Sequence, residues 1–155
     1  MSIASQIKVS ARYTRSVNLE RDSQSDSLDL GYIPTSRALR TLATINSRFS
    51  ETDLPRAWSL VGPYGSGKSS FALFLSHLLA DPSLKKTKVA RKVLKKTDPE
   101  LEASLRAETK GTQGYVEVLI SGTPERLSMR YLRGLQEAMS DYWQGRKGKK
   151  PSVLA

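Results

Sequence analysis

The chain has 155 residues, 38% of them hydrophobic, and its 25 Lys and Arg residues against 15 Asp and Glu residues give a net charge of +10. This length allows one domain at most, and the absence of cysteine excludes both a disulfide framework and a thiolate metal site. No apolar run is typical of a signal peptide or long enough to span a membrane. We therefore expect a cytoplasmic protein without membrane contact, whose positive charge suits an anionic partner.

The first 30 residues predict one strand and a polar connector. Apolar and polar side chains alternate over residues 6–13, which is typical of a half-exposed strand. Ser and Asp crowd residues 16–29, where we expect a loop with little fixed structure. We assign residues 1–30 to this unit, residues 31–145 to the main module and residues 146–155 to a basic disordered tail.

A helix is predicted from Thr35 or Ser36, either of which can cap it, to about Phe49. It follows the segment Gly31-Tyr32-Ile33-Pro34. Its apolar residues recur on one face. They are Ala38, Leu42, Ile45 and Phe49. We expect this face to lean on a sheet.

The next segment carries the most specific motif of the chain. Residues 57–61 (AWSLV) form a short apolar run that predicts a parallel strand covered on both faces. The chain then spells G-x-x-x-x-G-K-[ST], the phosphate-binding loop motif. This loop and the residue after it are Gly62, Pro63, Tyr64, Gly65, Ser66, Gly67, Lys68, Ser69 and Ser70. Residues 69–80 predict a buried helix that ends at Asp81-Pro82, so the motif has the strand and the helix that it requires.

The residue types of this loop indicate binding of ATP and Mg²⁺. Glycines let the backbone N–H groups turn toward an anion, and the helix dipole adds positive potential there. Lys68 is the predicted catalytic residue, reaching the β- and γ-phosphates, and the Ser69 hydroxyl is the predicted magnesium ligand. ATP is favoured over GTP because no N-K-x-D sequence specifies guanine. Tyr32 and Ile33 could contact adenine, although simple packing at the start of their helix is the interpretation we favour.

Residues 84–96 predict a basic amphipathic helix without any acidic residue. Its cations are Lys85, Lys86, Lys88, Arg91, Lys92, Lys95 and Lys96. Nucleic acid is a possible partner for this face, but a solvated surface is the commoner explanation and the one we favour.

The remaining segments predict a surface helix, a strand and a final helix. Thr97 and Glu100 have the spacing of a capping box for a helix that ends at Lys110-Gly111 and has a thin apolar face. Residues 115–120 predict a strand. The last helix starts at Thr123-Pro124 and stops at Gly145. Its predicted apolar face consists of Leu127, Tyr131, Leu135, Ala138 and Tyr142. The single histidine, His77, is expected to pack in the core.

The order of these segments resembles the N-terminal ATPase region of large bacterial AAA+-like proteins, some of which belong to antiphage defence systems. The resemblance covers about residues 6–143. Its specific part is the loop GPYGSGKSS, whereas GYIP and VEVLISGTPERLS match only as a loose pattern. It implies a truncated ATPase whose further strands follow residue 155, and a partner that is either the remainder of the ATPase or a further copy of the chain.

These ATPases also place an acid at the end of an apolar strand, where it orients the attacking water. Neither Glu117, inside its predicted strand, nor Glu125, after a proline, has that position. We therefore expect the chain alone to hydrolyse ATP very slowly or not at all.

The sequence predicts an α/β fold, namely a P-loop NTPase-like parallel sheet with flanking helices and an incomplete core. The alternatives are a small basic nucleic-acid-binding or scaffold protein that uses the loop as an anion site, and a compact kinase.

Overall fold

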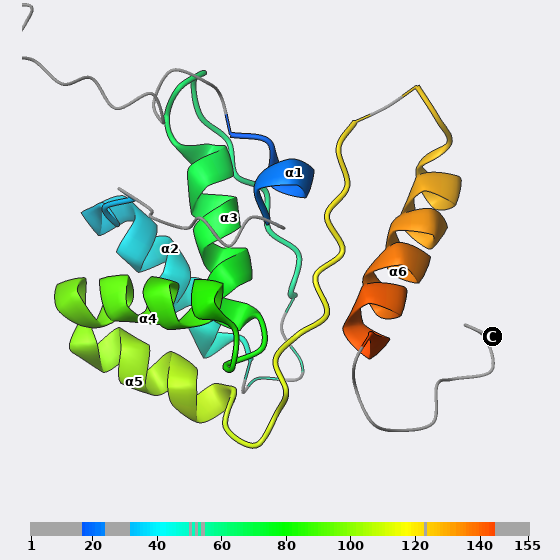
Figure 1. Ribbon diagram of the computed structural model, residues 1–155. Helices are drawn as coiled ribbons and strands as arrows, with labels where there is room; N and C mark the ends of the chain where they lie inside the picture. The colour runs from blue at the N-terminus through cyan, green and yellow to red at the C-terminus, as the bar shows by residue number, and fades with distance from the viewer. Residues whose placement is uncertain are drawn as a thin grey trace, which may run out of the picture.

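The computed structural model describes residues 17–23, 32–49, 51, 53, 55–122 and 124–144. Within them the chain forms six helices, and none of these residues forms a strand (Figure 1). The helices are α1 (Leu19–Ser23), α2 (Ser36–Ser47), α3 (Lys68–Leu79), α4 (Lys85–Thr97), α5 (Pro99–Glu108) and α6 (Leu127–Trp143). The described fold is all-α, and the predicted α/β fold with a parallel sheet is wrong. The strand predicted over residues 6–13, Gly31, Gly145 and the predicted tail lie outside the described residues.

The other two predicted strands are corrected to irregular chain, which for residues 115–120 is extended and runs between the helical core and α6 (Figure 1). A strand needs a neighbour for its N–H and C=O groups. No described segment is such a neighbour to residues 57–61 or 115–120. Residues 57–61 were expected to be covered on both faces, but they are open instead, with Val61 91% exposed and Trp58 44% exposed. Tyr115 N donates to Leu79 O at 2.9 Å, which ties the second segment to the end of α3 rather than to another strand.

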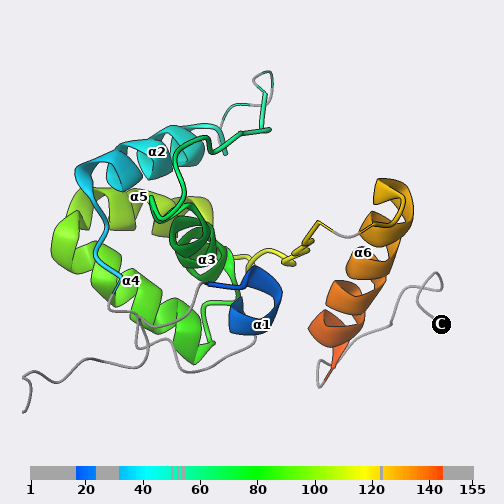
Figure 2. The same ribbon diagram turned by 90° about the horizontal axis from the view of Figure 1, so that it is seen from above.

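The core surrounds α3, which Figure 2 shows nearly end-on with α1, α2, α4 and α5 around it. The sequence of α3 explains this position, because it has no acidic residue and few polar ones, and Phe71, Phe74 and Leu78 are buried in it. Helices α2, α4 and α5 each contribute one apolar stripe to the same cluster. The stripes are Leu42 and Ile45 on α2, Ala90 and Leu94 on α4, and Leu101 and Leu105 on α5.

Helix α2 has the predicted cap and apolar face, but its predicted contact with a sheet is wrong. Thr35 Oγ1 accepts from Ala38 N at 3.3 Å, and Leu42 and Ile45 are buried. The helix packs against α5 instead, where Asn46 Nδ2 donates to Ser104 Oγ at 2.8 Å.

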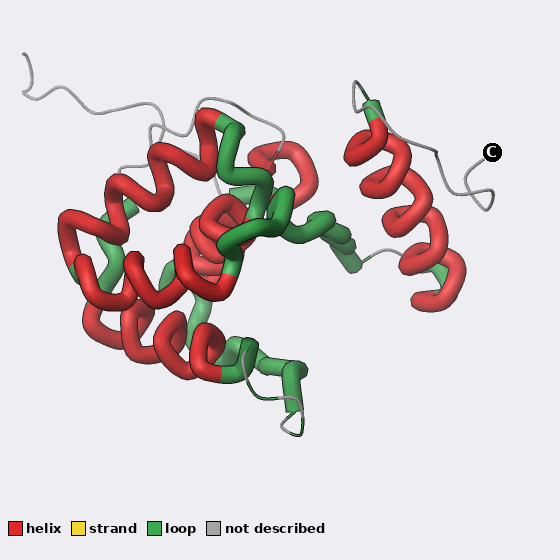
Figure 3. The backbone as a smooth tube through the Cα atoms, turned by 90° about the horizontal axis from the view of Figure 1, so that it is seen from below, coloured by secondary structure: helices red, strands yellow, loops and turns green. Residues whose placement is uncertain are grey.

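Helices α4 and α5 pack side by side as a helical hairpin (Figure 3). The residue that caps α5 is Asp98 and not Thr97, since Asp98 Oδ1 accepts from Leu101 N at 2.9 Å and Thr97 Oγ1 donates back to Val93 O. Pro99 then occupies the first turn, where its missing N–H costs nothing. The apolar face of α5 is narrow as predicted, yet Leu105 is only 1% exposed, so this helix is a full part of the core.

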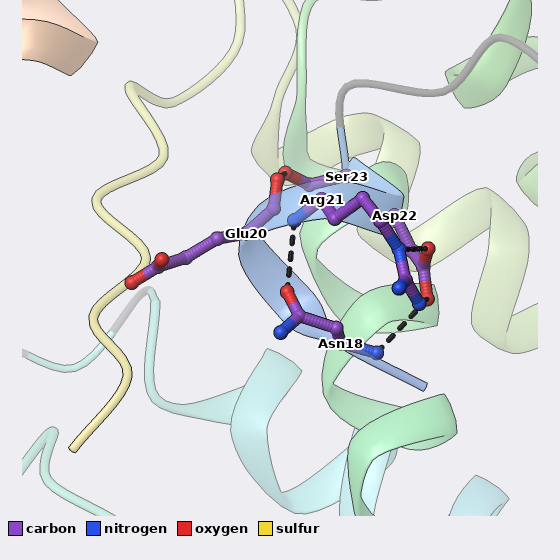
Figure 4. A network of polar contacts seen from close by, with 5 residues as sticks. All are labelled: Asn18, Glu20, Arg21, Asp22 and Ser23. Atoms are coloured by element: carbon purple, nitrogen blue, oxygen red, sulfur yellow. Dashed lines mark hydrogen bonds and ion pairs between the residues drawn. The ribbon is translucent and has the colours of Figure 1, made fainter. Parts of the chain in front are cut away.

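Helix α1 lies inside the segment that we expected to be a loop without fixed structure, and that expectation is wrong for residues 19–23. Asn18 and Asp22 stabilise it reciprocally. Asn18 Oδ1 accepts from Arg21 N at 3.0 Å, and Asp22 Oδ2 accepts from Asn18 N at 2.9 Å. Figure 4 shows this network, with the Glu20 side chain pointing away from it toward the extended segment.

Glu20 connects α1 to the C-terminal part of the fold. Its Oε1 accepts from Ser121 N at 2.8 Å and from Arg130 Nη2 at 2.6 Å. Helix α6 otherwise stands apart from the core (Figures 1 and 3). Its predicted apolar face is only partly covered, because Leu127 and Tyr131 are exposed while Leu135 is half-buried. No helix among the described residues is both long and apolar enough to cross a membrane.

Candidate functional site

The phosphate-loop residues form a tight turn that leads directly into α3. Gly65 and Gly67 have φ values of +78° and +83°, a left-handed conformation that other residues adopt at a cost of roughly 1–2 kcal/mol each. A Cβ on Gly62 would lie 3.1 Å from Ser66 Oγ, which leaves little room for a larger residue there. Gly65 and Gly67 therefore share one reason to be glycine, whereas the limit at Gly62 is set by the movable Ser66 side chain.

The start of α3 presents free backbone donors. Gly67 is its N-cap and no side chain caps the helix, and the first backbone acceptor used is Gly67 O, by Phe71 N at 2.9 Å. The N–H groups of residues 68–70 thus have no partner within the helix. Ser69 is exposed and Ser70 half-buried at this end. Free donors, the positive end of the helix dipole and two hydroxyls make this end suitable for an anion.

Lys68 lies across the mouth of the loop. Its Nζ donates to Gly62 O at 2.9 Å and to Pro63 O at 2.8 Å, and lies 3.4 Å from Ser66 Oγ. The ammonium is therefore held by carbonyl oxygens at the beginning of the loop while its own backbone starts α3. All three N–H groups of this ammonium have an acceptor within the loop, so a phosphate bound here would have to replace at least one of these contacts.

The aromatic residues near the loop divide into one exposed and one packed residue. Tyr64 is 97% exposed at the loop. Tyr32 packs on Phe74, with 4.8 Å between the ring centroids, and burial raises its pKa. Ile33 is 79% exposed. Tyr32 is thus a core contact, as we favoured, whereas the packing that we expected of Ile33 is wrong because its side chain is exposed.

The acidic residues that we considered for catalysis are held in ion pairs. Glu117 Oε2 lies 3.2 Å from Lys86 Nζ, and Glu125 Oε1 lies 2.8 Å from Arg133 Nη2. Within the described part of the chain, no group of three or more His, Asp or Glu side chains could hold a metal ion. Any Mg²⁺ here would rely on the Ser69 hydroxyl and on the phosphates themselves.

His77 is completely buried on α3 and lies outside the loop. Its pKa is lowered to about 4, mainly because burial disfavours the charged imidazolium and also because the Lys86 charge is near; the Ser23 backbone acts weakly in the opposite direction. His77 thus packs in the core, as predicted, and its lowered pKa keeps it neutral near pH 7.

A groove of about 480 Å³ lies away from the loop, between α1, α6 and the extended segment. Its charged lining includes Glu20, Asp81, Lys86, Glu117, Arg130, Glu137 and Asp141. Acids outnumber cations there, and both cations are already in ion pairs. This groove is therefore unsuited to a phosphate, and the loop is the better candidate for an anionic ligand.

Sequence reasoning did not find the contacts of Glu20, whose pKa is lowered by the Ser121 N–H and by Arg130. Its partners are more than 100 residues away, so no local signal could have revealed them.

No model of a known protein family matches the chain, and no curated protein or solved structure matches it.

Proposed function

We propose that this chain binds ATP with Mg²⁺ through residues 62–70. The single observation that carries the proposal is the conjunction at the start of α3: the G-x-x-x-x-G-K-[ST] residues, two left-handed glycines, uncapped N–H groups and the Lys68 ammonium all lie at one helix end, although residues 57–61 before the loop do not form the strand that the motif requires. Lys68 would bind the β- and γ-phosphates, the N–H groups of the loop would bind phosphate oxygens, and Ser69 would be the protein ligand of Mg²⁺.

By its resemblance to AAA+-like ATPases, the chain would act as the nucleotide-binding part of a larger ATPase in the cytoplasm. The acid that orients the attacking water would come from another part of that ATPase or from a partner. The ion pairs of Glu117 and Glu125 support this division, because neither carboxylate is available without breaking a contact to a cation. Binding without fast turnover is therefore the expected behaviour of the chain by itself.

Calorimetry with ATP and Mg²⁺ tests the proposal. Lys68→Met removes the ammonium and keeps the length of the side chain, and we expect the dissociation constant to rise by about 10- to 150-fold, because a charge-assisted hydrogen bond contributes about 1.5–3 kcal/mol. Lys92→Met is the matched control, since Lys92 is an exposed lysine on α4 that should not touch the nucleotide.

Ser69→Ala is the companion variant, and it should weaken ATP binding with Mg²⁺ more than ATP binding with EDTA. An equal affinity for ATP in wild type, Lys68→Met and Ser69→Ala would exclude this loop as the nucleotide site.

A further inference from the structure

Helix α4 carries an uninterrupted row of exposed lysines. These are Lys85, Lys88, Lys92, Lys95 and Lys96, which all lie on the side of the helix opposite its buried residues Thr87, Ala90 and Leu94. We call these five residues the lysine row. The other two cations of α4 have structural partners and do not belong to it, because Lys86 pairs with Glu117 and Arg91 Nη2 donates to Thr109 Oγ1 at 3.0 Å.

Among the described residues, no acidic side chain forms an ion pair with the lysine row. The ion pairs among the described residues that involve lysine include Lys86 alone, and no acidic residue occurs anywhere in α4. Lys85, Lys88 and Lys92 follow one another at three or four residues, and Lys95 and Lys96 lie three and four residues after Lys92, so neighbouring ammonium groups repel each other. Lys85 and Lys88 also lie in the first turn, where the helix dipole disfavours cations. The bare helix face is thus electrostatically unfavourable and would gain from a bound anion.

The length of the lysine row suits a phosphodiester backbone. Eleven residue steps of α-helix, from Lys85 to Lys96, span about 16 Å. The same length of duplex contains about five base pairs, and so about five phosphates on each strand. From this match we propose that the lysine row binds the phosphate backbone of nucleic acid, independently of its sequence. This partner is separate from the nucleotide at the loop.

A membrane surface fits the same helix less well. A helix that lies on a bilayer needs an apolar face directed toward the lipid. The apolar face of α4 is already used, because Ala90 and Leu94 are 0% exposed in the core and Val93 packs against the same cluster. Only electrostatic attachment remains, and a regular anionic polymer satisfies it along the whole row. For these reasons we favour nucleic acid over a membrane surface as the partner of the lysine row.

Fluorescence anisotropy with labelled duplex DNA tests this surface. If all five lysines meet phosphates, the logarithm of affinity should fall with the logarithm of salt at a slope of about −4.5, which is roughly a 500-fold loss between about 50 and 200 mM salt. A variant with Lys88, Lys92, Lys95 and Lys96 changed to Gln should reduce the magnitude of this slope by about 3 to 4. Arg91 stays unchanged because it has a structural contact.

The control variant has the same charge change at exposed cations outside α4: Arg37→Gln, Arg40→Gln, Lys110→Gln and Arg126→Gln. It should keep most of the slope. Circular dichroism should show unchanged helix content in both variants, and if the α4 variant loses helix, Lys92→Gln with Lys95→Gln should give about half of the effect. Absence of DNA binding at low salt, an equal loss in the control variant, or tighter binding to anionic phospholipid vesicles than to DNA would each overturn the proposal. The Lys68→Met protein should bind DNA like wild type, which separates this test from that of the ATP site.

Discussion

The single histidine offers a clean measurement of how burial affects stability. His77 is completely buried, and its pKa is about 4 in the folded chain against an ordinary 6.5. Because the folded state disfavours the charged imidazole, the neutral form stabilises the fold fully above pH 6.5, and this contribution is lost as the pH falls from 6.5 toward 4. Linkage of these two values gives a loss of about 2 kcal/mol between pH 7 and pH 5, and about 3 kcal/mol at lower pH.

Urea denaturation followed by circular dichroism at pH 7, 6 and 5 should reveal this loss as a fall of about 1 M in the unfolding midpoint. His77→Leu fills the site with an apolar side chain and removes the titration. Its stability at pH 7 can differ from wild type, but it should change by less than about 0.5 kcal/mol between pH 7 and pH 5. The comparison is within each variant, so a change in packing does not disturb it.

Few other groups titrate in this range, since the chain has no cysteine and only one histidine. Glu20 changes the stability in the same direction as His77, but at lower pH. Its pKa is lowered, so its stabilising contacts are present above about pH 4.5 and are lost below it. An equal fall in wild type and His77→Leu between pH 7 and pH 5, or no fall in either, would show that burial of His77 does not control stability there.

Two further predictions concern backbone positions. Gly114 and Gly111 both have φ near +80°, but a Cβ on Gly114 would lie 2.5 Å from the backbone at the end of α3, whereas Gly111 faces open space. In urea denaturation, Gly111→Ala should lower the free energy of unfolding by about 1 kcal/mol, and Gly114→Ala should lower it by at least about 2 kcal/mol more. Asp98→Ala should destabilise the protein by about 1 kcal/mol because Asp98 caps α5 at Leu101, while Thr97→Ala should change stability by less than half of that. Equal effects within either pair would contradict the geometry.

Helix positions were predictable from the sequence because their signals are local. The apolar stripe from Leu42 to Ile45 and the Thr35 cap predict α2, and the absence of charge after Lys68 predicts buried α3. The sequence predicts the position of a helix cap only to within one residue, as the choice between Thr97 and Asp98 illustrates. Both residues can accept a hydrogen bond, and only the local backbone conformation decides between them.

Strands were not predictable in the same way, because a strand is stabilised by partners elsewhere in the chain. The run at residues 57–61 has the composition of a covered strand, yet Val61 is almost fully exposed and no described neighbour pairs with it. The same reasoning applies to α6. Periodicity places Leu127 and Leu135 on the same face of the helix, but it does not predict which part of the chain covers that face. At the loop, the motif predicts which residues gather and not that Lys68 rests on the carbonyl groups of residues 62 and 63.

The contacts of Glu20 have a consequence for the order of folding. Helices α3, α4 and α5 pack against neighbours in the chain, whereas Glu20 meets Ser121 and Arg130 at sequence separations of 101 and 110 residues. Closing so large a loop costs entropy that only an already compact core can offset. During synthesis, Glu20 is also made about 5 to 20 seconds before Ser121. We therefore expect Glu20 to meet its two donors, Ser121 N and Arg130 Nη2, only after the core has formed, with attachment of α6 as a late step of folding.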